Sequence, residues 1–297
     1  MKILLLGKNG QVGWELQRSL APLGDLVALD RYVVDGLCGD LSDLDALRRT
    51  IRQVKPDFIV NAAAYTAVDK AELEAELADR VNGQASRVMA EEAASLGAWL
   101  IHYSTDYVFS GEGSTPWHET DAVAPVNHYG ASKLAGEQAI VASGCKHLIF
   151  RTSWVYAARG NNFAKTMLRL AKDRETLSVI ADQIGAPTGA DLIADVTALV
   201  IQQVMQRADL AGIYHLAAGG EVSWHGYASH VIKFAQANGE VLAVSAVNPI
   251  ETTAYPTPAR RPLNSRLNTQ KLRDNFYLHL PDWQSGVTRM LREVLNK

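Results

Sequence analysis

Short apolar runs alternate with amphipathic segments over the first half of the chain. Residues 2–6 form a nearly continuous apolar run that ends at Gly7, which is typical of a strand buried on both faces of a parallel sheet. Residues 11–21 follow with Val12, Leu16 and Leu20 spaced four apart, so they share one face of a helix. Further strands are expected at 26–29, 58–60, 99–103 and 147–150, with helices at 85–96 and 129–141. This βαβ spacing predicts an α/β fold with a doubly wound, Rossmann-like parallel sheet.

The second half of the chain lacks this regular alternation, because prolines break it into shorter helices and loops. These are Pro187, Pro249, Pro256, Pro258, Pro262 and Pro281. We therefore expect a dinucleotide-binding domain over residues 1–155. Residues 156–297 are expected to form mainly a smaller substrate-binding lobe, with some segments returning to the first domain.

Composition narrows the class of protein. Hydrophobic residues make up 47% of the 297 positions, and Lys+Arg 29 against Asp+Glu 32 gives a net charge of -3. This balance gives no reason to expect nucleic acid or an anionic membrane as a partner. Two cysteines suit a reducing cytoplasm, and neither an apolar run of about 20 residues nor a signal-peptide pattern stands out. The expectation is a cytoplasmic enzyme.

A glycine turn joins the first strand to the first helix. Gly7, Gly10 and Gly13 follow the G-x-x-G-x-x-G spacing. Glycines at such a turn let a dinucleotide pyrophosphate approach the backbone N–H groups at the positive end of a helix. The alternative is an ordinary glycine-rich strand–helix turn.

An acid stands at the end of the second expected strand. Asp30 lies about 20 residues after the glycines, where a carboxylate can accept a hydrogen bond from the adenosine ribose 2′-OH of NADH. The neighbouring Arg31 can pair with the 2′-phosphate of NADPH, so both cofactors stay open. Alternatively, the two residues are simply a surface acid and a surface base.

Tyr129 and Lys133 are four residues apart, so they share one face of the expected helix. A nearby ammonium lowers the pKa of a phenol, which otherwise lies near 10, and makes it a better acid–base group. Thr105 at the end of an earlier strand offers a hydroxyl for a substrate oxygen. A solvated helix face is the alternative interpretation.

Seven blocks carry a wider pattern: GKNGQVGWE (7–15), NAAAYTAVDKAE (61–72), STDYVF (104–109), YGASK (129–133), FRTSWVY (150–156), DQIGAPT (182–188) and TPARRP (257–262). Together they resemble the extended short-chain dehydrogenase/reductase superfamily and, within it, the dTDP-4-dehydrorhamnose reductases. The resemblance covers essentially the whole chain. It implies that Tyr129 is the proton donor, that Lys133 lowers its pKa and holds the nicotinamide ribose, and that Thr105 orients the substrate carbonyl or the phenol.

The resemblance also implies contacts with NADPH or NADH. The implied residues are Gln11 and Val12 at the pyrophosphate, Asp40 and Leu41 at the adenine, and the small side chains of Ala62, Ala63 and Ala64 along the cofactor. For Asp40 the alternative is a strand-end or helix-capping acid, and for the alanines it is simple close packing.

A third set of residues is implied at the dTDP-sugar: Asp106, Trp154, Arg260 and Arg261. A core tryptophan and solvated loop arginines are the alternatives, and Phe163 is a further pocket candidate or a core residue. Sugar-nucleotide 4,6-dehydratases carry a second acid after the one that matches Asp106. Here Tyr107 follows, which favours plain ketone reduction over elimination.

The resemblance further implies a homodimer and an Mg²⁺ ion at a dimer contact, held by Glu15, Asp191 and Glu293. Solvated helix-face acids are the alternative.

The leading hypothesis is NAD(P)H-dependent reduction of dTDP-4-dehydro-6-deoxy-L-mannose (dTDP-4-dehydrorhamnose) to dTDP-L-rhamnose. Two alternatives stay open. One is a reductase or epimerase of another nucleotide sugar. The other is a non-catalytic subunit resembling the regulatory subunit of methionine adenosyltransferase.

Overall fold

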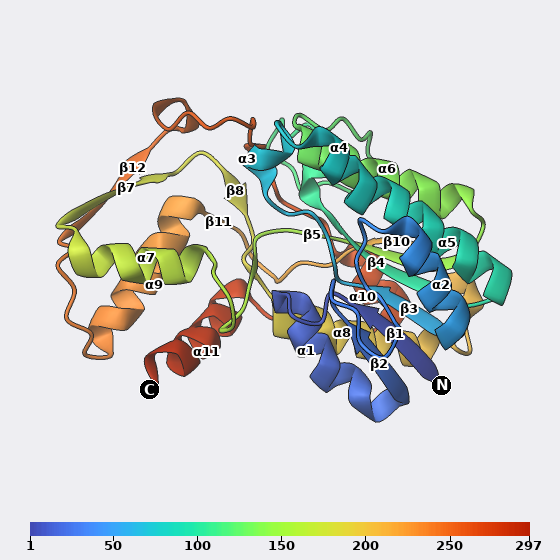
Figure 1. Cartoon of the computed structure of the whole chain (residues 1–297). Helices are drawn as coiled ribbons and strands as arrows, with labels where there is room; N and C mark the ends of the chain where they lie inside the picture. The colour runs from blue at the N-terminus through green and yellow to red at the C-terminus, as the bar shows by residue number, and fades with distance from the viewer.

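A six-stranded parallel sheet forms the centre of the larger lobe in the computed structural model, which describes residues 1–297 (Figure 1). Its strand order is β10-β5-β4-β3-β1-β2. The strands are β1 (Lys2–Leu6), β2 (Asp25–Leu29), β3 (Phe58–Asn61), β4 (Trp99–Thr105), β5 (Lys146–Thr152) and β10 (Gly212–His215). The predicted doubly wound parallel sheet is confirmed.

Strand β1 pairs with β2 on one side and with β3 on the other, both in parallel. The direction of winding therefore reverses between β1 and β3. Open α/β sheets bind ligands at this point, outside the carboxyl ends of the strands.

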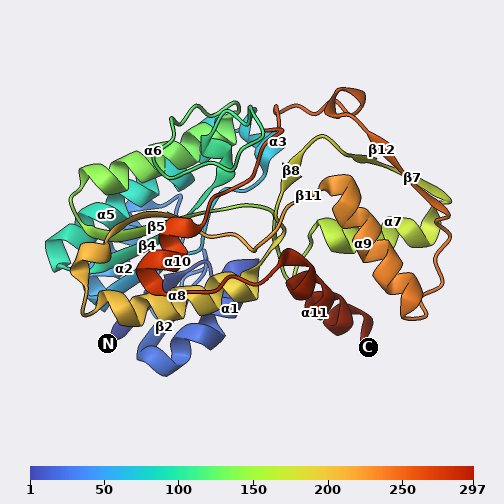
Figure 2. The same cartoon turned by 180° about the vertical axis from the view of Figure 1, so that it is seen from behind.

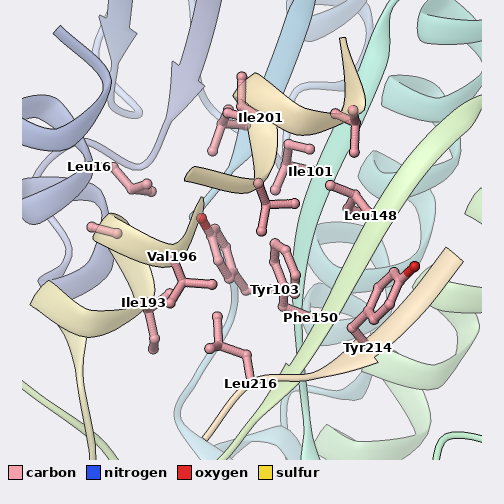
Figure 3. Close-up of a cluster of buried hydrophobic side chains, with 14 of the residues drawn as sticks. Leu16, Ile101, Tyr103, Leu148, Phe150, Ile193, Val196, Ile201, Tyr214 and Leu216 are labelled. Carbon is pink, nitrogen blue, oxygen red and sulfur yellow. The ribbon is translucent and has the colours of Figure 1, made fainter. Parts of the chain in front are cut away.

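Helices cover both faces of the sheet (Figures 1 and 2). On one face lie α1 (Gln11–Leu20), α8 (Ala190–Val204) and α10 (Gln270–Phe276). Figure 3 shows this core, with Tyr103 and Phe150 of the sheet lying near Ile193 and Val196 of α8. On the other face lie α2 (Leu44–Val54), α5 (Ala85–Leu96) and α6 (His128–Ala142). The remaining short segments of this lobe are α3 (Val68–Ala71), α4 (Ala75–Ala78), the π-helical turn η2 (Asp79–Gln84) and the 3-10 turns η1 (Ala21–Leu23), η3 (Asp106–Val108) and η4 (Ala208–Leu210).

The smaller lobe has a core of its own, in which α9 packs against α7, α11 and β7 (Figure 2). Its elements are α7 (Phe163–Asp173), β7 (Thr176–Ile180), α9 (Trp224–Ala237), β12 (Ala246–Ile250), η5 (Thr252–Ala254) and α11 (Trp283–Leu295). Strands β7 and β12 pair in parallel. Short two-residue strands lie on the chain connections: β6 (Val155–Tyr156) pairs with β9 (Thr188–Gly189), and β8 (Ile184–Gly185) pairs with β11 (Val222–Ser223).

The chain passes between the two lobes more than once. Strand β10 pairs with β5 as an outer strand of the large sheet, although it follows the first segments of the smaller lobe. Helices α8 and α10 also pack on the large sheet. No helix of the structure is both long enough and apolar enough to span a membrane.

Candidate active site

The glycine turn is shaped by close backbone contacts at the point where the sheet winding reverses. Gly7 has a φ of +87°, and a Cβ there would lie 2.6 Å from the amide nitrogen of Ala63. A Cβ on Gly13 would lie 2.0 Å from the carbonyl oxygen of Gly7. Gly10 is the N-cap of α1 and contributes no side-chain cap, so the first amides of this helix have no side-chain acceptor there. The turn therefore fits a dinucleotide pyrophosphate, which the amides of Gln11 and Val12 would face.

Asp30 lies beside this turn. Its carboxylate accepts hydrogen bonds from the Asn9 side chain and, at 2.9 Å, from the backbone amide of Tyr32. The neighbouring Arg31 is fully exposed and lies over the Tyr32 ring, 5.2 Å from its centroid. The position of Asp30 next to the glycine turn is compatible with the predicted ribose contact.

The other residues expected along the cofactor differ in their surroundings. Leu41 is 4% exposed and belongs to the core under α2 and α5, so packing accounts for its side chain. Asp40 binds the backbone amide and hydroxyl of Ser42, while Asp43 caps α2. The run Ala62, Ala63 and Ala64 is half-buried directly after β3, next to Gly7.

Helix α6 begins at an asparagine cap and carries Tyr129 and Lys133 on adjacent turns. The Asn127 side chain accepts a hydrogen bond from the Gly130 amide at 2.8 Å. Asn82 in the π-helical turn binds the Ser132 hydroxyl at 2.9 Å and both backbone groups of Tyr65. These contacts fix the start of α6 against the neighbouring segment.

Tyr129 lies beside Thr105, the last residue of β4, and Asp106, which follows it. Burial raises the pKa of Tyr129 to about 12; a hydrogen bond with Thr105 lowers the pKa, and the Asp106 carboxylate raises it. Lys133 is not among the groups that lower this pKa, so the chain alone does not show the lowered phenol pKa that the sequence led us to expect.

Asp106 is the most unusual carboxyl group of the site. It is 2% exposed, and its Oδ2 atom has no hydrogen-bond partner. Burial raises its pKa to about 7, although hydrogen bonds with Ser265 and Thr105 act in the opposite direction. Its Oδ1 accepts a hydrogen bond from the Thr105 hydroxyl at 3.1 Å.

Lys133 is 2% exposed and extends toward the sheet. Its Nζ donates to the backbone carbonyl of Tyr103 at 2.6 Å and lies 3.2 Å from Nε2 of His102. Burial lowers the pKa of Lys133 to about 8, against the opposing effect of Glu137. Sequence reasoning missed His102 because it stands inside an apolar strand run.

An open cavity of about 620 Å³ lies between the two lobes, beside Tyr107. The Tyr107 ring packs edge-on against the Tyr129 ring, with centroids 5.7 Å apart. Side chains of α7, β7 and the 250–261 segment line the cavity, and so does Trp224. Its size and its mixed polar and apolar lining fit a small organic ligand.

The two arginines of the TPARRP block have different positions. Arg261 lines the cavity and forms an ion pair with Asp69 at 2.7 Å, while its Nη1 is buried without a partner. Arg260 is exposed, and its backbone carbonyl accepts a hydrogen bond from Asn127 at 2.8 Å. Of these two arginines, only Arg261 lines the cavity.

Trp154 lies behind the cavity wall. Its ring stacks on Trp224 with centroids 3.6 Å apart, and its φ of 50° is uncommon for a bulky residue. Trp224 and Phe163 line the cavity directly. Trp224 also donates a hydrogen bond to Gln183, which in turn donates to Thr252, and both of these residues line the cavity too. Neither Trp224 nor Gln183 was a sequence candidate.

The expected Mg²⁺ site is not supported. Glu15 and Asp191 line a common cleft of about 600 Å³, but each is paired with an arginine, Arg18 and Arg289 respectively. Glu293 is exposed and does not line this cleft. The structure contains no group of three or more residues placed to hold a metal ion. The arginines already neutralise the carboxylates that a cation would need.

The sheet, the glycine turn and the Tyr–Lys helix define the class: a Rossmann-fold oxidoreductase of the extended short-chain dehydrogenase/reductase type. The family model described as RmlD substrate binding domain matches residues 1–296. The dTDP-4-dehydrorhamnose reductase of Shigella flexneri is 60% identical over 99% of this chain and 98% of its own length.

Two solved structures agree. The dTDP-4-dehydrorhamnose reductase of Bacillus anthracis, in complex with NADP, is 36% identical with a TM-score of 0.87, covering 98% of this chain and 99% of that one. The Clostridium acetobutylicum protein of the same name is 34% identical with a TM-score of 0.88 over the full length of both chains. The chain belongs to the dTDP-4-dehydrorhamnose reductase family.

Proposed function

We propose that the protein reduces the C4 ketone of dTDP-4-dehydro-6-deoxy-L-mannose to give dTDP-L-rhamnose, with Tyr129 as the proton donor. One observation carries the role of Tyr129: its phenol, held beside Thr105, packs against the ring of Tyr107, which lines the cavity of about 620 Å³. Family membership over the full chain supports the substrate.

In this mechanism NADPH or NADH supplies the hydride when bound. Tyr129 donates its phenolic proton to the oxygen of the ketone as negative charge develops there. Thr105 holds the same oxygen or the phenol by its hydroxyl. As an ammonium, Lys133 stabilises the phenolate that Tyr129 becomes after donating its proton.

The division of labour between the lobes follows from this proposal. Residues 1–155, with the returning segments α8, β10 and α10, would hold the cofactor at Gly7, Gly10 and Gly13. Residues 156–297 would supply most of the sugar-nucleotide contacts. Arg261 would contact the diphosphate, and Trp224 would pack against the rings of the sugar nucleotide. The choice between the two cofactors would rest on Asp30 and Arg31.

We further propose a cytoplasmic homodimer. The buried free cysteines Cys38 and Cys145 fit a reducing compartment. Light scattering of the purified protein would measure the dimer directly, and a monomer at all concentrations would contradict that part of the proposal.

A coupled assay tests the reaction. The substrate is made from dTDP-glucose by the two preceding enzymes, and loss of the reduced-nicotinamide absorbance is followed together with the identity of the sugar product. We expect oxidation of the cofactor and formation of dTDP-L-rhamnose. Matched UDP-sugar ketones test the alternative of another nucleotide sugar. If the protein forms a stable complex with another protein but oxidises no cofactor, the non-catalytic hypothesis holds instead.

A further inference from the structure

Three buried polar side chains form a continuous row beneath helix α6. Asn61 of β3 and His102 of β4 are opposite each other in the sheet register, and the Asn61 amide nitrogen lies 3.1 Å from Nδ1 of His102. The other ring nitrogen, Nε2, lies 3.2 Å from Nζ of Lys133. All three residues are at most 2% exposed. Because buried polar groups are nearly always hydrogen-bonded, we expect each donor in the row to face an acceptor.

A backbone amide sets the direction of this row. The Ala63 N–H is always a donor, and it binds Oδ1 of Asn61 at 3.2 Å. The other end of the Asn61 amide is an NH₂ group, so it donates to Nδ1 of His102. If the amide turned over, its NH₂ would face the Ala63 N–H, and two donors would meet.

The orientation of the Asn61 amide fixes which ring nitrogen of His102 carries the proton, and so what faces Lys133. Burial holds the pKa of His102 well below its usual range, so the imidazole is neutral and carries a single proton. Since Nδ1 accepts from Asn61, that proton is on Nε2. Nε2–H therefore points at Nζ of Lys133, which can accept only as an uncharged amine with a free electron pair. The amine keeps N–H donors, and one of them binds the Tyr103 carbonyl at 2.6 Å.

We propose that Asn61 and His102 are positioning residues that favour the neutral amine of Lys133 in the free protein, and that Lys133 takes up a proton when the dinucleotide binds. The catalytic importance of this proton uptake rests on the proposed function, since it is the ammonium form of Lys133 that would assist Tyr129. It adds two residues, at positions without an assigned role, to the machinery of the reaction.

The charged groups packed around Lys133 leave its amine form accessible. Helix α6 itself contributes Tyr129 and Glu137, and β5 contributes Arg151, which is bound to Glu137 at 2.7 Å. Strand β4 contributes His102 and the backbone carbonyl of Tyr103, and β3 contributes the uncharged Asn61. Glu137 favours the ammonium, but Arg151 already neutralises it. Burial lowers the pKa of Lys133 to about 8, and the His102 contact favours the amine in addition.

The first test is the tautomer of His102 in the isolated protein. Long-range ¹H–¹⁵N correlation spectra distinguish Nε2–H from Nδ1–H imidazoles, and a His102→Gln variant assigns the signal among the eight histidines. At pH 8.5 we expect the Nε2–H tautomer. An Nδ1–H tautomer or an imidazolium at that pH would overturn the proposal, and this measurement needs no variant to be active.

A near-isosteric variant should reverse the direction of the hydrogen bonds along the row. In Asn61→Asp one carboxylate oxygen still accepts from Ala63, while the other accepts from His102, which must then carry its proton on Nδ1. Nε2 becomes an acceptor and favours the Lys133 ammonium. We expect the Nδ1–H tautomer in this variant. In the matched control, Asn61→Ala, no group dictates the direction, so we expect a mixture of the two tautomers. An unchanged Nε2–H signal in Asn61→Asp contradicts the inference.

The second test measures protons directly. Calorimetric titration of the protein with NADPH in two buffers of different ionisation enthalpy gives the number of protons taken up on binding. At pH 8.5 we expect net uptake by the unmodified protein, and much smaller uptake by Asn61→Asp and by Lys133→Met. Zero uptake by the unmodified protein, with tight binding, would overturn the proposal. Neither test contains sugar, so a failed reductase assay with these results intact would refute the proposed reaction alone.

Discussion

The Asn127 side chain joins the start of helix α6 to the backbone at Arg260. Its oxygen accepts from the Gly130 amide, and its NH₂ group donates to the Arg260 carbonyl, each at 2.8 Å. The two contacts tie the helix that carries Tyr129 to the segment that carries Arg261. One residue therefore links the expected proton donor to the sugar-nucleotide cavity.

Variants of Asn127 should separate these two roles. Asn127→Ser retains a helix-capping oxygen but is too short to reach Arg260. We expect near-normal thermal stability with a several-fold higher KM for the sugar nucleotide. Asn127→Ala loses both contacts and should also lose about 0.5–2 kcal/mol of stability. Thermal unfolding and steady-state kinetics measure both effects. Equal KM values in all three proteins would show that this contact does not position Arg261.

Removal of the Tyr129 hydroxyl tests the proton donor. Tyr129→Phe keeps the ring and its packing against Tyr107, so we expect little change in cofactor affinity. General acid catalysis is typically worth about 10²–10⁴-fold, and kcat should fall by that order. Lys133→Met is the comparison: it should reduce both kcat and cofactor affinity, because the lysine is expected to contact ribose as well. A folded Tyr129→Phe variant with nearly unchanged kcat, under conditions where a 4-deuterated cofactor slows turnover, would exclude Tyr129 as the donor.

Asp30 should influence the choice of cofactor. In Asp30→Ala the expected hydrogen bond to the ribose 2′-OH is lost, and so is repulsion of a 2′-phosphate. NADH binding should weaken by about 1–2 kcal/mol, and preference should shift toward NADPH. Dissociation constants for both cofactors measure this. An unchanged ratio of the two constants would place Asp30 outside the adenosine site.

Asp106 should make the protein less stable as the pH rises. Its pKa is about 7 in the folded chain against an ordinary value of 3.8, so between these values the folded state binds more protons than the unfolded state. The stabilising effect is fully present below pH 3.8 and is lost as the pH rises through 7. Each unit of pKa difference corresponds to about 1.4 kcal/mol.

The Asp106→Asn variant measures this contribution. An amide cannot ionise, so the variant should gain stability relative to the unmodified protein between pH 5 and pH 8. Denaturant unfolding at the two pH values gives the difference. If the stability difference between the two proteins is the same at both pH values, the carboxyl group titrates normally.

The hydrophobic pattern predicts the large sheet well because β1, β3, β4 and β5 are buried on both faces. Their runs are nearly continuously apolar, and the structure extends them by only a few residues at the ends. Strand β12 contains Pro249 and is partly exposed, so local pattern gives no signal for its pairing with β7. Helix α2 was not among the expected elements, although Leu47 and Ile51 pack in the core.

The candidate site was predicted where its chemistry is local in sequence. The glycine turn and the Tyr129–Lys133 pair each occupy a few consecutive residues, so spacing alone suggests them. Contacts such as Asp69 with Arg261 join residues 192 positions apart, and no local pattern reports them. Trp154 illustrates the same difficulty. Only the fold shows that it stacks on Trp224, and that Trp224 rather than Trp154 lines the cavity.

The repeated passage of the chain between the two lobes has a mechanical consequence. The segments before α7, before α8, after β10 and before α10 all bridge the same gap, and the β6–β9 and β8–β11 pairs fasten neighbouring bridges together. A single flexible bridge would allow one lobe to swivel freely on the other. Several bridges fastened in parallel resist this torsion, which helps to keep the residues that the two lobes contribute to the cavity in a fixed relative orientation.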